Sequence, residues 1–405
     1  MGIKLNKNTW WYFLVATLSI LGCFNNQILS DFLPLISVIQ LSTRVLVFAA
    51  CLFYSILVNR SFSRPFIIYS SLIMVFLLSG LFNSSNIVSL FGNLSYSLTI
   101  AMVLEAFRKD QRALLTIMRI WKWIIVLLLI IDFIIELAFP SGMYESRAYT
   151  LNWFLGYKSE RAVYTLPLII MTSFISVKTK GHITLESYGI FAIVMLNSIL
   201  SKGTVMTFTM LVLITLIVIS DLLSRTKMQR LKKALRFIID YRIIIPVYSI
   251  FTIALLFSEN NFLVKFISDL FNKDNGISSR DVIWEKLLHL LDSKMVLGTG
   301  FMSRNQYIGI SGFPGGSNAH NAILTLLVNG GLIAIAIYIV LHVITIHKNK
   351  GTASTPLILA IYANLLFGTV SSIMVLSTFS MLPFFILEDE KKQHSPKKGC
   401  VKHRP

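Results

Sequence analysis

The chain has few charged residues, acidic ones above all, and few cysteines. Only 14% of its 405 residues are charged, and 19 aspartates and glutamates face 37 lysines and arginines. This low charge, with 55% hydrophobic residues and a mean hydropathy of +0.71, excludes a soluble globular protein. The three cysteines, Cys23, Cys51 and Cys400, are isolated, which excludes a disulfide framework and a cysteine-based metal site.

The apolar residues are gathered into blocks long enough to cross a membrane. A hydrocarbon core about 30 Å thick requires a helix of about 20 apolar residues. Because the first block lacks a small-residue cleavage site, we interpret it as a retained helix. The sequence therefore predicts an all-α polytopic membrane protein with about 12 transmembrane helices and a large extracytoplasmic loop that contains an amphipathic helix. The blocks lie at residues 10–26, 43–59, 65–82, 86–104, 120–139, 161–177, 184–200, 204–221, 243–257, 320–346, 356–369 and 371–387.

The basic residues predict the orientation of these helices. Although the net charge is +18, the lysines and arginines lie in short gaps between apolar blocks, so we expect no nucleic-acid partner. Short positively charged loops stay in the cytoplasm, which places both termini on the cytoplasmic side of the cell membrane. The predicted organisation is transmembrane helices 1–9 at residues 1–257, an extracytoplasmic loop at 258–319, C-terminal transmembrane helices at 320–388 and a cytoplasmic tail at 389–405.

The long loop contains a predicted amphipathic helix, SSRDVIWEKLLHLLDSK, at residues 278–294. Ser278 and Asp281 have the spacing of a capping box, which predicts a helix start near Ser279. We expect this helix to lie on the outer membrane face with Trp284 at the level of the lipid headgroups. Its apolar stripe consists of Ile283, Leu287, Leu290 and Leu291.

Arg280 and His320 are the candidate catalytic residues. Arg280 falls in the first helical turn, where the helix dipole disfavours a cation, so helix stability does not explain it. A guanidinium there can hold a phosphate through two parallel hydrogen bonds, and the alternative is a solvated surface arginine. Asn318 is a candidate N-cap, which would place His320 in the first turn of the next helix as a neutral proton acceptor. The alternative is a structural interfacial histidine.

A second group of polar residues surrounds the predicted external loop at residues 140–160. Arg147, Lys158 and Arg161 are interleaved with aromatic residues and could bind a polyanionic headgroup, although an ordinary interfacial belt explains them equally well. Asp132 and Glu136 lie four residues apart near the outer end of the fifth block. They could hydrogen-bond an acceptor sugar, relay protons or pair with a cation of a neighbouring helix.

These motifs together resemble the O-antigen ligase and polymerase superfamily, which includes Wzy-type polysaccharide polymerases. The pattern is S-R-x-x-x-W, then G-x-G in a tight loop, then A-H-N before a membrane helix that contains N-G-G. FLGYKSER departs from the usual polymerase segment, so the first-loop arginine stays open between Arg147 and Arg161. SKGT at residues 201–204 resembles the polar turn before a membrane helix in this family. The matching residues are Arg280, Trp284, Gly298, Gly300, His320, Asn321, Gly330 and Gly331.

The resemblance implies a glycosyltransferase of the GT-C kind that needs no metal and no cofactor. Its substrate would be an oligosaccharide on undecaprenyl pyrophosphate, and its partners would be membrane lipids, with a chain-length regulator and a flippase as further candidates. Arg280, with Arg147 or Arg161, would hold the pyrophosphate, and His320 would activate the acceptor hydroxyl for an inverting attack. Lys158, Asn321 and Trp284 are further candidate substrate-binding residues.

Three alternatives to a polymerase of O-antigen, capsule or exopolysaccharide remain at this stage. A ligase that transfers glycan to a lipid A core shares the same motifs. A lipid-linked oligosaccharide transporter would show inverted repeats, which we do not find in the sequence. A scaffold of an export complex would need neither Arg280 nor His320.

Overall fold

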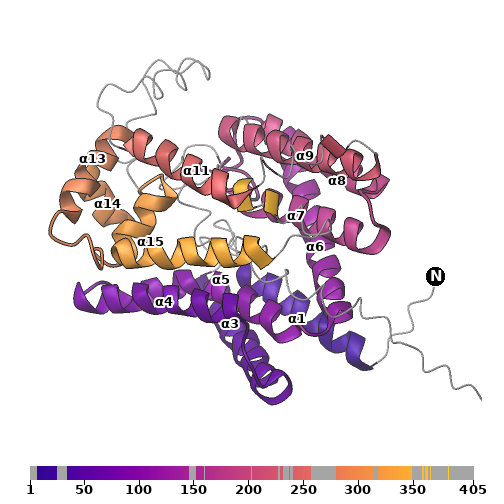
Figure 1. Ribbon diagram of the computed structural model, residues 1–405, viewed down its shortest axis with the longest axis horizontal. Helices are drawn as coiled ribbons and strands as arrows, with labels where there is room; N and C mark the ends of the chain where they lie inside the picture. The colour runs from indigo at the N-terminus through magenta and orange to yellow at the C-terminus, as the bar shows by residue number, and fades with distance from the viewer. Residues whose placement is uncertain are drawn as a thin grey trace, which may run out of the picture.

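The described part of the chain is built from α-helices (Figure 1). The computed structural model describes residues 7–24, 34–145, 152–158, 160–201, 203–226, 240–256, 280–312 and 318–348, with a few isolated positions between 229 and 382. The helices of the first half are α1 (Lys7–Cys23), α3 (Pro34–Tyr54), its π-helical continuation η1 (Ser55–Asn59), α4 (Arg64–Phe82), α5 (Ile87–Phe107) and α6 (Gln111–Ala138). Those of the second half are α7 (Ala162–Lys180), α8 (Leu185–Leu200), α9 (Thr204–Arg225), α11 (Tyr241–Leu256), α13 (Arg280–Leu291), α14 (Arg304–Ser311) and α15 (Ala322–Lys348).

The prediction of an all-α polytopic membrane protein is confirmed. Seven of the described helices are long and apolar enough to cross a membrane, and α1 and α8 contribute shorter apolar segments. Each of the first ten predicted blocks coincides with a helix. The last two blocks, at 356–369 and 371–387, fall almost entirely outside the described residues, so the count of 12 stays a prediction.

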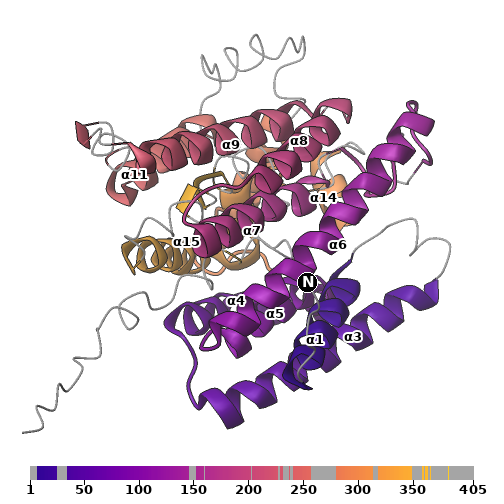
Figure 2. The same cartoon turned by 90° about the vertical axis from the view of Figure 1, so that its right-hand side faces the viewer.

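The helices are arranged in layers that α6 joins. Figure 2 shows α1, α3, α4 and α5 below, α7 and α15 in the middle, and α8, α9 and α11 above. Helix α6 crosses from the lower to the upper layer and packs against α1, α7 and α8. Helices α13 and α14 lie together at one end of α15 (Figure 1).

Helix ends in the lower layer follow from local side-chain caps. Ser63 precedes α4, and its hydroxyl accepts a hydrogen bond from the Phe66 N–H at 3.3 Å. Asp110 precedes α6, and one carboxylate oxygen accepts from the N–H groups of Arg112 and Ala113. Such caps satisfy backbone donors that a helix leaves unpaired at its start.

Helix α15 is broken in its middle at Gly331. The φ of this residue is 64° and its ψ is −161°, a conformation that favours glycine. Because the break interrupts an apolar helix, the freed backbone groups need partners from the protein itself.

The segment 294–300 provides these partners on both sides of the break. The Thr299 N–H donates to the Val328 carbonyl at 2.8 Å, and the Leu332 N–H donates to the Met295 carbonyl at 2.9 Å. The two halves of α15 and this segment therefore form one hydrogen-bonded unit. The sequence motifs G-x-G and N-G-G meet in space at this point.

We expect Gly331→Ala to destabilise the protein by at least about 2 kcal/mol. A Cβ at this position would lie 2.1 Å from the Val296 carbonyl oxygen, and the positive φ adds strain. Thermal unfolding of the detergent-solubilised protein measures the effect. Gly309→Ala is the matched control, because a Cβ there meets nothing within 4 Å. Equal melting temperatures for the two variants would contradict this account of the break.

Candidate functional site

The described part of α13 starts at Arg280, and the predicted cap at Ser278 lies outside the described residues. The helix packs against the start of α15 through a separate hydrophobic cluster. The buried members of this cluster are Ile283, Trp284, Leu287, Leu291, Met302, Tyr307, Ala319, Leu324, Leu327 and Val328.

The Trp284 side chain does not face the lipid headgroups. Its side chain is 2% exposed, and its indole N–H donates to the Ala319 carbonyl at 2.9 Å. The reason is that the helix presents Ile283, Leu287 and Leu291 of its apolar stripe to the rest of the protein, whereas Leu290, the fourth predicted member, is exposed. Trp284 therefore connects α13 to the residue immediately before His320.

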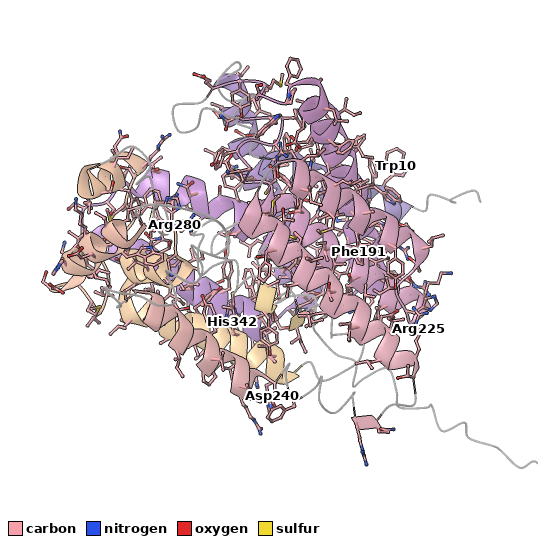
Figure 3. The ribbon with its side chains drawn as sticks, turned by 90° about the horizontal axis from the view of Figure 1, so that it is seen from above. Trp10, Phe191, Arg225, Asp240, Arg280 and His342 are labelled. Carbon is pink, nitrogen blue, oxygen red and sulfur yellow. The ribbon has the colours of Figure 1, made fainter. Side chains whose placement is uncertain are left out.

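This bond places Arg280 and His320 in one part of the molecule. Arg280 lies one helical turn from Trp284, a rise of about 6 Å, and on the same face of α13. His320 follows Ala319, whose carbonyl accepts the hydrogen bond from the Trp284 indole. Arg225 follows the eighth predicted block, at a point that the predicted orientation places in the cytoplasm. Arg280 and Arg225 lie on opposite sides of the molecule in Figure 3.

His320 is partly exposed and has a φ of 50°, which is uncommon for a residue other than glycine. Its N–H donates to the Asn318 side-chain oxygen at 2.8 Å, which makes a local turn. The predicted N-cap was wrong: Asn318 forms this turn, and the helix begins at Ala322. His320 therefore precedes the helix and is not within its first turn.

Asn321 is the residue that caps α15. Its side-chain oxygen accepts from the Leu324 N–H at 2.9 Å, and its carbonyl accepts from the Thr325 N–H at 2.9 Å. The residue is fully buried. Asn321, expected to be a substrate-binding residue, thus has a structural function that fixes the position of His320.

Arg161 forms a buried ion cluster with Asp132 and Glu136 of α6. Its Nε lies 3.1 Å from an Asp132 oxygen, and its Nη1 lies 2.8 Å from a Glu136 oxygen. The Asn197 amide also donates to Asp132 at 3.1 Å, and the Trp153 ring lies 4.8 Å from the guanidinium carbon. All five side chains are at most 5% exposed.

This cluster answers the open question about the two carboxylates: they pair with a cation at the start of the neighbouring helix α7. The two carboxylates more than offset the single positive charge of Arg161, which leaves it poorly suited to hold a pyrophosphate. Arg147, the other first-loop arginine, lies outside the described residues.

Lys158 and Glu160 occupy the described end of the first loop. Lys158 is half-buried, and its ammonium lies 5.6 Å from the centroid of the Tyr157 ring. Burial raises the pKa of Glu160, whose carboxylate accepts from the Tyr157 N–H at 3.0 Å. Across the ranges that the structure describes, histidine, cysteine and acidic side chains form no group of three that could hold a metal ion.

Sequence reasoning missed α14 and the break in α15. Ser303 and Gln306 form a capping box at the start of α14, a pattern that is visible in the sequence. The break has a weaker signal, because N-G-G alone does not indicate which glycine leaves the helical conformation.

A comparison with protein families supports the resemblance. Residues 165–339 match the family described as O-Antigen ligase. The match includes Arg280, Trp284, His320 and Asn321, and it begins just after Arg161. The recognition of the O-antigen ligase and polymerase superfamily is thereby confirmed over this segment. A comparison with curated proteins finds no significant match.

Proposed function

Residues 165–339 match the family described as O-Antigen ligase, and on this premise we propose that the protein is a polysaccharide polymerase. It transfers a glycan from a polyprenyl pyrophosphate donor to a sugar hydroxyl of a second lipid-linked repeat unit. The reaction takes place at the outer face of the cytoplasmic membrane, with both termini in the cytoplasm.

The observation that carries this proposal is the bond between Trp284 and Ala319. It joins the helix that carries Arg280 to the turn that contains His320. The two residue types suit the two charge changes of glycosyl transfer, since one accepts a proton and the other stabilises an anionic leaving group.

In the proposed reaction, the His320 imidazole accepts the proton of the acceptor hydroxyl. The hydroxyl oxygen forms a bond to the anomeric carbon as the bond from that carbon to the pyrophosphate oxygen breaks, which inverts the configuration. Arg280 hydrogen-bonds the pyrophosphate as its negative charge develops, and the pyrophosphate remains on the lipid.

A second cation is expected at the pyrophosphate. Since Asp132 and Glu136 neutralise Arg161, we assign this role to Arg147, with Lys158 as an additional headgroup contact. Trp284 and Asn321 position the two catalytic groups and do not themselves bind the substrate.

A purified assay with a synthetic undecaprenyl pyrophosphate repeat unit tests the function. A ladder of products identifies a polymerase, whereas movement of the lipid without a new glycosidic bond would contradict the proposal. We expect EDTA to leave the rate unchanged, because arginines, and not a divalent cation, assist departure of the pyrophosphate. A strict magnesium requirement would contradict the arginine mechanism.

A ligase is the second candidate function, and the description of the matched family favours it. It would use the same donor and the same two residues but a different acceptor. In the same assay, a ligase yields a single transfer to an added acceptor in place of a ladder.

We expect Arg280→Lys to lower the turnover rate by about 10- to 100-fold, because an ammonium cannot reproduce the paired hydrogen bonds of a guanidinium. Initial rates in the purified assay measure this loss. Lys286→Arg, also on α13, is the control and should retain activity, because Lys286 contacts the Ser311 carbonyl instead. A wild-type rate for Arg280→Lys would indicate a diffuse electrostatic role for Arg280.

A further inference from the structure

Arg44 is a buried arginine that the proposed reaction does not use. It lies in the middle of α3 and is 4% exposed. Its Nη1 donates to the Gly22 carbonyl at 3.2 Å, and its guanidinium carbon lies 3.6 Å from the centroid of the Tyr96 ring. These contacts hold it where α1, α3 and α5 meet.

The charge of Arg44 is only partly compensated. Among the described residues it has no carboxylate within ion-pair distance, and its buried Nε has no hydrogen-bond partner. The C-terminal end of α1 carries about half a negative charge, and a tyrosine ring contributes a weak attraction. Arg161, by contrast, is equally buried but has two carboxylates. A buried guanidinium that no described anion neutralises is costly and indicates a binding role.

The depth of Arg44 suits a lipid phosphate of the outer leaflet. Helix α3 and η1 run continuously from Pro34 to Asn59, and about 20 residues cross the hydrocarbon core. Counted from the predicted cytoplasmic end at Asn59, the outer boundary falls near Gln40, and Arg44 lies about 6 Å below it. An arginine side chain at this depth reaches the headgroup level.

The surroundings connect this position to the first loop. Gln40, one turn above Arg44 on the same face, donates to the Phe24 carbonyl. The Phe24 ring lies 6.1 Å from the Phe154 ring of the first loop and 5.9 Å from the Tyr164 ring of α7. Arg44 therefore adjoins the loop whose other cations are candidate headgroup ligands.

We propose that Arg44 binds the phosphate group of a membrane lipid in the outer leaflet, at a position on α3 that is separate from Arg280. The inference rests on the proposed orientation of the helices and adds a second phosphate contact to the proposed function. A reaction between two lipid-linked chains needs such a contact, because both substrates carry a pyrophosphate. The phosphate could also be that of a phospholipid, which has the same chemistry.

Lipid binding to the detergent-solubilised full-length protein tests the proposal. Native mass spectrometry gives dissociation constants for undecaprenyl pyrophosphate and for phosphatidylglycerol. The Arg44→Gln variant removes the charge but retains a donor for the Gly22 carbonyl. We expect it to weaken phosphate-lipid binding by about tenfold or more while leaving the melting temperature of the lipid-free protein unchanged.

One control variant and the comparison of the two lipids make the result decisive. Arg119→Gln removes the same charge from an exposed position near the predicted cytoplasmic end of α6, and it should leave the binding constants unchanged. If Arg44→Gln weakens the binding of undecaprenyl pyrophosphate alone, the ligand is a substrate phosphate. If it weakens the binding of both lipids, Arg44 belongs to a general lipid-phosphate site. Unchanged binding of both lipids would overturn the proposal and leave Arg44 as the cap of α1.

Should Arg44→Gln fail to fold, photoreactive undecaprenyl pyrophosphate and photoreactive phosphatidylglycerol are each cross-linked to the wild-type protein instead. Adducts of either lipid near Arg44 on α1, α3 or α5 support the proposal, and adducts of both lipids confined to other helices overturn it. Because both measurements record binding without turnover, they remain valid even if the glycosyl transfer reaction proves wrong.

Discussion

His320→Asn is expected to lower glycosyl transfer by about 10²- to 10⁴-fold, the usual contribution of a general base. Asparagine is the informative substitution, because His320 has a φ of 50° that asparagine tolerates and most other residues do not. The variant therefore removes the imidazole without straining the turn before α15. Initial rates with the undecaprenyl pyrophosphate repeat unit measure the loss.

The control for this prediction is His289→Asn, because His289 is an exposed histidine on α13, the helix that packs against the start of α15. It should retain both the rate and the melting temperature of the wild type. If His320→Asn still produced glycan at the wild-type rate, the proton would have to be accepted by another group, and the proposed mechanism would be wrong.

Arg161→Met is expected to destabilise the protein by about 3–5 kcal/mol. The substitution leaves Asp132 and Glu136 buried without their shared cation, which is far more costly than the absence of the whole cluster. Thermal unfolding in detergent and the yield of folded protein measure this loss.

The triple variant Asp132→Asn/Glu136→Gln/Arg161→Met separates a structural role from a catalytic one. It should recover most of the stability and, with Arg147 as the pyrophosphate ligand, most of the activity. A stable but inactive triple variant would instead identify Arg161 as a ligand of the substrate. Lys122→Met is the control for Arg161→Met. It should destabilise the protein by only about 1 kcal/mol, because its partner Glu186 is half-exposed and stays solvated without the lysine.

The presence of the helices could be predicted from composition, because an apolar run of membrane length has few alternatives to a helix. Arg280 lies in α13 as predicted, whereas the predicted helix start near Ser279 and its cap at Ser278 fall outside the described residues and stay predictions. The burial of Trp284 against the protein was not predicted. An amphipathic helix can turn its apolar stripe to lipid or to protein, and the sequence of the stripe is the same in both cases.

The cap of α15 shows a second limit of the sequence. Asn318 and Asn321 are equally good caps by residue type. The choice between them depends on the bond from Trp284 to the Ala319 carbonyl and on the turn at His320. Both are tertiary features that the local sequence does not encode.

The polar cluster of α6 was predicted in part. The spacing of Asp132 and Glu136 placed both carboxylates on one face of a helix, and a basic partner on a neighbouring helix was one of three interpretations. The partner itself, Arg161, could not be identified, because its position depends on how α7 packs against α6.

The most direct test of the account is whether residues 280 and 320 line one site that opens to the outside. Cysteines at these two positions, in a protein whose native Cys23, Cys51 and Cys400 are replaced by alanine, can be joined by a short bifunctional thiol reagent. We predict that a membrane-impermeant form of this reagent, added to intact cells, cross-links the pair. Modification only after the cells are opened, or modification of both cysteines without a cross-link between them, would contradict the claim.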